Sequence, residues 1–175
     1  MLKLILMRHA KSNWSDKKRN DFDRPLSKRG KEAAPEIGRA LSERGLIPDR
    51  ILCSPARRAR DTLKLVIDAM AIKPPISYED QLYAFGDGTA YLNAISRQKD
   101  SSTLMLIGHN PSAQNLAQRL AATGDISATN RIKRKFPTAA VAVIALPIDN
   151  WSELQTASGA SGDLQLFLTP KMLEE

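Results

Sequence analysis

Short apolar runs alternate along this chain with segments whose apolar residues recur on a helical period. The runs have the length and composition of buried strands, and they lie at 2–7, 50–53, 102–107, 139–146 and 164–168. The helix-like segments between them lie at 27–44, 57–70, 89–95 and 112–121. This alternation predicts an α/β fold with three α/β/α layers, in which helices cover both faces of a mainly parallel central sheet. Because no helix is expected between the last two strands, one strand of the sheet has room to run antiparallel.

The chain has 175 residues, which suits one domain spanning 1–175, with a core large enough to need no disulfide or metal. Within the first helix-like segment, Pro35 predicts a kink and Gly45 is placed to end the helix. A single cysteine excludes an internal disulfide framework. The apolar stretch at the start is too short for a signal peptide or a membrane span, so we expect a cytoplasmic protein without a membrane partner.

The net charge of +7 raises the question of an anionic partner. The densest basic run is Arg131–Lys135, which is expected to be a solvated loop. The alternative is that it steers an anionic substrate or an acidic protein partner. Nucleic acid is not expected, because the basic residues are scattered and only 5% of residues are aromatic.

Polar, chemistry-bearing residues follow three of the predicted strands directly. Arg8-His9 follows the first, Ser54-Pro55 leads into a helix that carries Arg58, and Gly108-His109 follows the third. The carboxyl ends of parallel strands meet at one edge of a sheet, where ligands collect. The chain has only two histidines, and both occupy such a junction. The pattern therefore predicts one site that combines imidazole and guanidinium groups.

These residues resemble the signatures of the histidine phosphatase superfamily, which includes the phosphoglycerate mutases. The closer likeness is to the short SixA-type phosphohistidine phosphatases. It rests on the motifs at 8–12 (RHAKS), 21–26 (DFDRPL), 108–111 (GHNP), 136–139 (FPTA) and 168–171 (LTPK). The likeness spans nearly the whole chain, with the motifs in the same order.

The resemblance implies a role for each matching residue. His9 corresponds to the nucleophile that becomes phosphorylated, and Arg8 and Arg58 correspond to the phosphate-binding arginines. His109 corresponds to the second histidine, which hydrogen-bonds the phosphoryl group. Further sites follow from the same likeness: Ser12 lies near the pocket, Ser15 replaces an asparagine of some mutases, and Asp23-Arg24 forms a structural ion pair.

The chemistry is consistent without the family. A phosphoryl dianion carries about two negative charges, which two arginines can balance. Catalysis of phosphoryl transfer is mainly positioning and electrostatics, and cationic neighbours keep a histidine neutral and nucleophilic. Neither a metal nor another cofactor is expected. The segment from Cys53 to Arg58 resembles the cysteine loop of tyrosine phosphatases, but Ala59 stands where that loop needs its arginine.

The predicted function is a metal-independent phosphatase for phosphohistidine in proteins. A phosphatase for small phosphate esters is the first alternative, and a module that binds phosphorylated partners without turnover is the second. The ester-cleaving relatives carry an acid that protonates the leaving group. Here Glu79, Asp80 and Asp87 are the candidates, and none aligns with that role.

Overall fold

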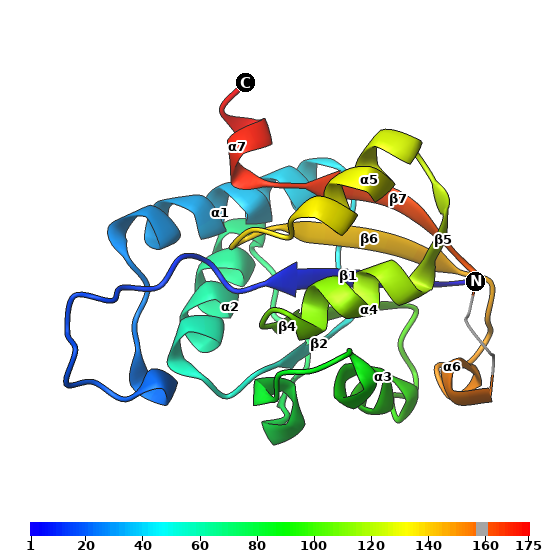
Figure 1. The fold of residues 1–175 in the computed structure, drawn as a ribbon. Coiled ribbons are helices and arrows are strands. Elements are labelled where there is room, and N and C mark those ends of the chain that lie inside the picture. Colours follow the sequence, from blue (N-terminus) through cyan, green and yellow to red (C-terminus); the bar gives the residue numbers. More distant parts are fainter. Residues whose placement is uncertain (157–160) are drawn as a thin grey trace.

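The computed structural model describes residues 1–156 and 161–175, and in this part of the chain seven strands form one sheet between two layers of helices (Figure 1). The strands stand in the order β3-β2-β4-β1-β6-β7-β5. Their bounds are β1 Leu2–Arg8, β2 Arg50–Cys53, β3 Ile76–Tyr78, β4 Thr103–Gly108, β5 Ala121–Gly124, β6 Val141–Leu146 and β7 Gly162–Leu168. The helices are α1 Lys28–Glu43, α2 Arg57–Met70, α3 Thr89–Ser96, α4 Ser112–Leu120, α5 Ile126–Arg134, α6 Glu153–Thr156 and α7 Pro170–Leu173.

The sheet is mainly parallel, as predicted. β1 pairs in parallel with β4, and β2 pairs in parallel with both β3 and β4. β6 alone runs antiparallel to its two neighbours, β1 and β7. The expectation that no helix separates the last two strands is wrong, because the short helix α6 follows β6. The three-layer α/β/α prediction is confirmed.

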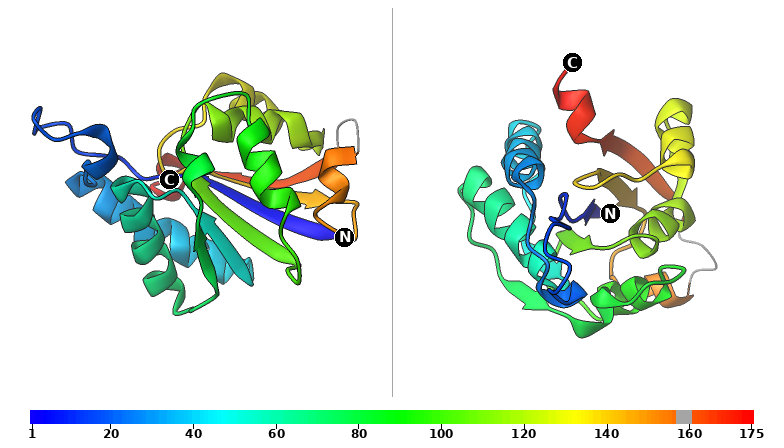
Figure 2. Two further views of the ribbon diagram at one scale, coloured as in Figure 1. Left: turned by 90° about the horizontal axis from the view of Figure 1, so that it is seen from below. Right: turned by 60° about the vertical axis from the view of Figure 1, so that its left-hand side comes forward.

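Alternate side chains of the central strands enter two separate hydrophobic clusters. In β1, Leu4 and Leu6 join the cluster that α3, α4 and α5 cover, whereas Ile5 and Met7 join the one beneath α1 and α2. All four side chains are 0% exposed, as expected of a strand covered on both faces. Burial of one such side chain is worth about 1.5–3 kcal/mol. The right-hand view of Figure 2 shows α1 and α2 on one side of the sheet and α4 and α5 on the other.

Helix α1 continues through Pro35 over its 16 residues. Ser27 caps its amino end by accepting a hydrogen bond from Gly30 N, and the buried side chains of Ala34 and Ile37 hold it against the core. Proline removes one backbone donor, but the packing keeps the helix intact. Gly45 follows the helix with a φ of +68°, the left-handed conformation that suits a residue just past a helix end.

Five elements lie outside the predicted ranges: β3, β5, α5, α6 and α7. β5 is mostly exposed, and α5 buries only Ile132. The prediction that the basic run Arg131–Lys135 is a loop is therefore wrong. The run forms the last turn of α5 and its C-cap. Cations are favourable there, because the helix dipole is negative at its carboxyl end.

The strand ends that carry the predicted site lie side by side. His9 N donates a hydrogen bond to Gly108 O at 2.9 Å, and Ser54 N donates one to Ile107 O at 3.0 Å. The carboxyl ends of β1, β2 and β4 thus form one edge, from which the chain enters the long segment 9–27 (Figure 1). None of the helices in the described ranges has the length and apolarity to span a bilayer.

Candidate active site

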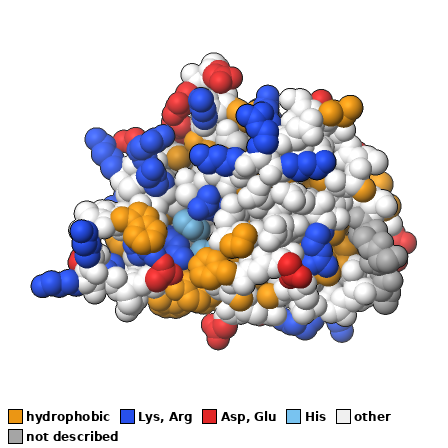
Figure 3. All heavy atoms as spheres, viewed as in Figure 1, with side chains coloured by type: hydrophobic (Ala, Val, Ile, Leu, Met, Phe, Trp, Pro, Cys, Tyr) orange, Lys and Arg blue, Asp and Glu red, His pale blue; other side chains and the backbone are white. Residues whose placement is uncertain are grey.

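The two histidines and the predicted arginines line one cavity at the carboxyl edge of the sheet. Its volume is about 330 Å³. The residues that line it are Arg8, His9, Lys11, Ser12, Trp14, Asp21, Arg24, Arg58, Phe85, His109, Asn110 and Thr138. Figure 3 shows the histidines in a hollow with hydrophobic side chains on either side. The structure thus brings the predicted residues Arg8, His9, Arg58 and His109 together at one cavity, and Ser12 lines it as well.

The His9 ring is held in one tautomer. Its Nδ1 lies 2.7 Å from Ala10 O, and because a carbonyl can only accept, Nδ1 carries the proton. The lone pair of the neutral ring is then on Nε2. Arg58 Nε donates to this Nε2 at 3.4 Å, which agrees with the assignment. His9 thus presents a basic nitrogen toward the guanidinium of Arg58.

Asp21 anchors the guanidinium of Arg58. The Nη1 group donates to Asp21 O at 2.8 Å, and Nη2 donates to Asp21 Oδ2 at 3.1 Å. The same carboxylate accepts a hydrogen bond from the Tyr83 hydroxyl and forms an ion pair with Arg24. Asp21 is the one carboxylate that lines the cavity within the described ranges. It therefore balances part of the positive charge and fixes Arg58 over His9.

Several buried donors around the cavity have no hydrogen-bond partner. Over residues 1–156 and 161–175, the buried side-chain nitrogens without one are Arg8 Nε, Arg24 Nε, Arg50 Nε and His109 Nδ1. All but Arg50 belong to residues that line the cavity. Leaving a buried donor unsatisfied costs about 1–3 kcal/mol. Three residues that line the cavity thus each keep one buried nitrogen without a hydrogen-bond partner among the described residues.

His109 is positioned by two hydroxyl groups. Its Nε2 lies 2.7 Å from Ser54 Oγ, and its backbone N donates to the Tyr91 hydroxyl at 2.8 Å. Tyr91 is fully buried and also donates to Leu82 O. A side chain at position 108 would collide with the Tyr91 ring, so the junction requires Gly108. The ring of His109 lies 5.1 Å from that of His9, centroid to centroid.

Burial keeps both histidines neutral. Burial lowers the pKa of His9 well below its ordinary value of 6.5, and the charges of His109, Arg58 and Arg8 lower it further, against the hydrogen bond to Ala10. Burial, with the charges of Arg58 and Arg8, lowers the pKa of His109 to about 3. At neutral pH the cavity therefore combines unprotonated imidazoles with cationic guanidinium groups.

The sequence matches the family model of the histidine phosphatase superfamily (branch 1) over residues 4–87. The chain is also 36% identical over 157 residues to an uncharacterized protein of Mycobacterium tuberculosis (strain ATCC 25618 / H37Rv), a match that covers 88% of this chain and 95% of that protein. The chain belongs to the histidine phosphatase superfamily.

Solved structures place it in the SixA-type branch of this superfamily. A protein of Agrobacterium tumefaciens with the provisional name phosphohistidine phosphatase SixA superposes with a TM-score of 0.80 at 29% identity, over 97% of this chain and 98% of that one. A protein of Nakamurella multipartitia with the same provisional name gives a TM-score of 0.79 at 32% identity, over 97% and 96% of the two chains.

One ion pair expected from the superfamily likeness is wrong. Arg24 pairs with Asp21 and not with its neighbour Asp23, whose backbone N instead donates to Asn20 Oδ1 at 3.0 Å. Because residues 21–23 form a 3-10 turn, the spacing from 21 to 24 brings that pair together. Arg24 also stacks on Trp14, 3.2 Å from the ring centroid, which fixes the segment over the cavity.

Of the two adjacent arginines at the start of α2, Arg58 lines the cavity and Arg57 does not. Arg57 pairs with Asp61 at 3.5 Å, and the exposed Ser15 does not line the cavity either. Cys53 is buried, its thiol donates to Ser54 O, and burial raises its pKa. A thiol held in this way is a poor nucleophile.

The three candidate acids lie outside the cavity. Glu79 faces Arg97 at 3.9 Å, Asp80 is exposed at the start of a 3-10 turn, and Asp87 is exposed and accepts from Thr89 N. The described ranges contain no cluster of three or more His, Cys, Asp or Glu residues that could hold a metal ion.

Sequence reasoning missed the residues that support the site. Asp21 was part of a quoted motif, but only folding brings the 3-10 turn onto Arg58. Tyr91 lies on α3 without any local signal of its role. The position of Ser54 at a strand end could have suggested a partner for a histidine at the neighbouring strand end.

Proposed function

We propose that this protein is a metal-independent phosphatase in which His9 is the covalent nucleophile, and that its substrate is phosphohistidine in a protein. One observation carries the proposal. The unprotonated Nε2 of His9 lies in the same cavity as the side chains of Arg8 and Arg58. A base surrounded by donors suits an electrophilic centre that carries negative oxygens.

In the first step, His9 Nε2 attacks the phosphorus. The Nε2–P bond forms while the bond from phosphorus to the substrate nitrogen breaks, and the leaving imidazole takes that electron pair and a proton from solvent. Arg8, Arg58 and His109 stabilise the charge on the non-bridging oxygens. The hydrogen bond from His9 Nδ1 to Ala10 O disperses the positive charge that develops on the ring.

In the second step, water attacks the phosphohistidine of the enzyme. The Nε2–P bond breaks, its electron pair returns to Nε2, and the proton of the attacking water passes to solvent as phosphate leaves. His9 is then neutral again, which its lowered pKa favours.

Two features of the cavity favour phosphohistidine over small esters. Its rim contains apolar rings, since Trp14 is 71% exposed and Phe85 is 60% exposed, and such rings suit a flat aromatic leaving group. Asp21, the one carboxylate that lines the cavity in the described part of the chain, forms ion pairs with two arginines. Expulsion of an alkoxide needs a general acid, whereas an imidazole leaves with a proton from solvent.

The alternatives differ in what they require. A phosphatase for small esters needs a free acid near the leaving group. A module that only binds phosphorylated partners needs the arginines but has no use for an unprotonated Nε2 on His9.

Quenching turnover in alkali tests the proposal, because phosphohistidine is stable to base. A protein phosphorylated on histidine with labelled phosphate serves as substrate. We expect label on His9, and no label or turnover in His9→Gln, while the matched surface variant Ser15→Ala keeps both. Unchanged turnover in His9→Gln would falsify the assigned nucleophile, and binding without turnover by the wild type would favour the binding module.

A further inference from the structure

A basic groove leads from the catalytic cavity to the C-terminal helix. Lys11 and Thr138 line both the cavity and a neighbouring middle pocket. Lys135, Pro137, Thr169 and Lys171 line both that middle pocket and an outer one. The shared residues make the three hollows continuous. The middle and outer pockets have volumes of about 450 and 390 Å³.

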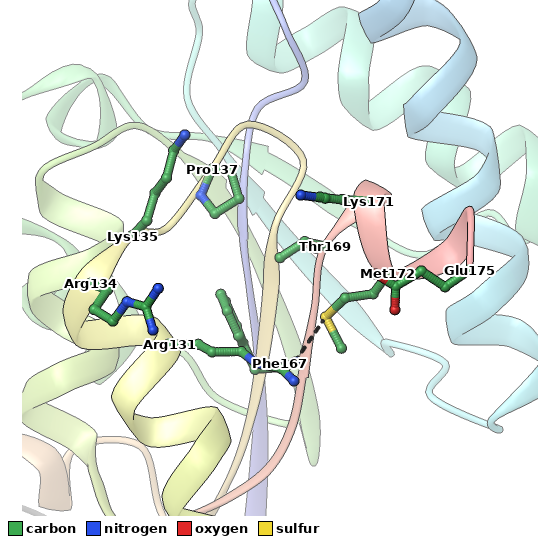
Figure 4. Close-up of a pocket in the computed structure, with 9 residues that line it drawn as sticks. All are labelled: Arg131, Arg134, Lys135, Pro137, Phe167, Thr169, Lys171, Met172 and Glu175. Atoms are coloured by element: carbon green, nitrogen blue, oxygen red, sulfur yellow. Dashed lines mark hydrogen bonds between the residues drawn. The ribbon is translucent and has the colours of Figure 1, made fainter.

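Cations dominate the walls of this groove. Lys11 and Arg29 stand near the cavity, Lys135 and Lys171 at the centre, and Arg131 and Arg134 at the far end. Figure 4 shows the outer pocket between α5, which supplies Arg131 and Arg134, and α7, which supplies Lys171. The only acidic side chain that lines either pocket within the described ranges is Glu175. The phosphatase chemistry of His9 does not use these cations.

We infer that the groove binds an acidic segment of the protein substrate, beside the phosphohistidine that enters the cavity. The inference rests on the proposed function, whose substrate it describes more closely. An anion in the groove would lie next to the phosphoryl group at His9, because Lys11 borders both spaces. A protein that carries both the phosphoryl group and an acidic segment beside it would then occupy the cavity and the groove together.

The walls favour a protein over a small anion or a nucleic acid. All six cationic side chains belong to exposed residues, which suits a long partner rather than a small ion that needs buried donors. The lining also includes Pro137, Phe167 and Met172, which can pack against aliphatic side chains. Phe167 is only 4% exposed, so the groove offers no ring for stacking bases.

Charge reversal at the centre of the groove provides the test. Lys135 and Lys171 are exposed and do not line the catalytic cavity, so K135E/K171E changes the groove alone. K73E/K99E makes the same change in net charge at two exposed lysines. These lysines lie just before the amino ends of β3 and β4, whereas the cavity lies at the carboxyl ends of the strands. K135Q/K171Q is the milder variant if charge reversal impairs folding.

Kinetics on a protein phosphorylated on histidine form the first arm. We expect K135E/K171E to raise KM and lower kcat/KM by about tenfold at low salt, with a smaller loss at physiological salt, where the Debye length is about 8 Å. K73E/K99E should behave as wild type. Turnover of p-nitrophenyl phosphate reports whether the cavity is intact, and it should match wild type in both variants. An equal loss in the two charge variants, or none in K135E/K171E, would overturn the inference.

Binding of an unphosphorylated peptide forms the second arm and does not depend on catalysis. Fluorescence anisotropy with a labelled glutamate-rich peptide should show salt-sensitive binding that K135E/K171E loses and K73E/K99E keeps. Failure of the wild type to bind the peptide would overturn the inference. Tighter binding of a single-stranded oligonucleotide of equal charge would show that the assigned occupant is wrong. If the peptide binds but no phosphohistidine protein is turned over, the proposed function is wrong, whereas the assignment of the groove as a site for an acidic segment is retained.

Discussion

Arg58 Nε donates a hydrogen bond to His9 Nε2 across 3.4 Å, and the rest of the Arg58 guanidinium is anchored by Asp21. The arginine therefore contacts the nitrogen that we assign as nucleophile. Since a guanidinium remains protonated in proteins, this contact favours the unprotonated form of the ring. A phosphoryl group at His9 would lie within reach of the same guanidinium.

Removal of this guanidinium should impair catalysis far more than folding. We expect Arg58→Ala to lower kcat by about 10²–10³-fold, as for the loss of one preorganised donor to the transition state. Arg58→Lys should recover little, because a lysine lacks the planar fork. Arg57→Ala is the matched control on the same helix, and the loss of its partly exposed pair with Asp61 should change kcat by less than about twofold. Similar kinetics for Arg57→Ala and Arg58→Ala would contradict the assignment.

The lowered pKa of His9 should be visible in a direct titration. A free histidine is half protonated near pH 6.5, whereas we expect the His9 ring to stay neutral at this pH, because burial lowers its pKa. The chain has two histidines, so NMR spectra of wild type and His109→Gln assign both rings. A His9 ring that titrates at or above pH 6.5 would refute the electrostatic argument.

The same shifts should make the fold sensitive to acid. A histidine whose pKa is lower in the folded state takes up its proton at a higher pH in the unfolded state than in the folded state. The contribution of the neutral ring to folding stability is therefore complete above pH 6.5. It is lost as the pH falls toward the pKa in the folded state, which is about 3 for His109. Each such histidine should lower the free energy of unfolding by about 1.4 kcal/mol per pH unit in this window. Urea unfolding of wild type and His109→Gln should differ in slope by this amount. Equal slopes would show that His109 is not buried as a neutral ring.

The chemistry of the leaving group should limit the substrates. Among the described residues the one carboxylate that lines the cavity, Asp21, is paired with arginines. Alkyl phosphates should therefore react about 10²–10⁴-fold more slowly than phosphohistidine, with activated aryl phosphates between the two. The triple variant E79Q/D80N/D87N should keep wild-type kcat, since none of these side chains lines the cavity. A sugar phosphate that reacts as fast as phosphohistidine, or a loss of kcat in the triple variant, would identify an acid outside our assignment.

Tyr91 should matter for stability through a single hydroxyl. Tyr91→Phe leaves the buried N–H of His109 and the carbonyl of Leu82 without this partner, which should cost about 1–3 kcal/mol of the free energy of unfolding. Tyr78→Phe is the control, because Tyr78 is 53% exposed and its change should stay within about 0.5 kcal/mol. Equal melting temperatures for the two variants would exclude this role of the hydroxyl.

Elements with a strong local pattern were predictable. β2 and the start of α2 fall where the sequence analysis expected them, and the carboxyl edge of the sheet gathers His9 and His109 as expected. β5 and α5 were missed, because β5 is mostly exposed and α5 buries only Ile132, so no run of buried apolar residues marks either element. The sequence also could not show that Arg24 pairs with Asp21, since that depends on a turn.

By itself, the sequence determined the layer architecture and the residue types at the strand ends. Both follow from the local sequence, because the period of the apolar residues determines whether a segment forms a helix or a strand. The end of a strand then determines where the next side chain lies. Only the tertiary structure decided what surrounds those side chains. Three features join residues far apart in sequence: the ion pair of Asp21 with Arg58, the contact of Ser54 with His109, and the groove between α5 and α7. Such pairs form when packing brings separate segments together, and no local pattern encodes their distance or burial.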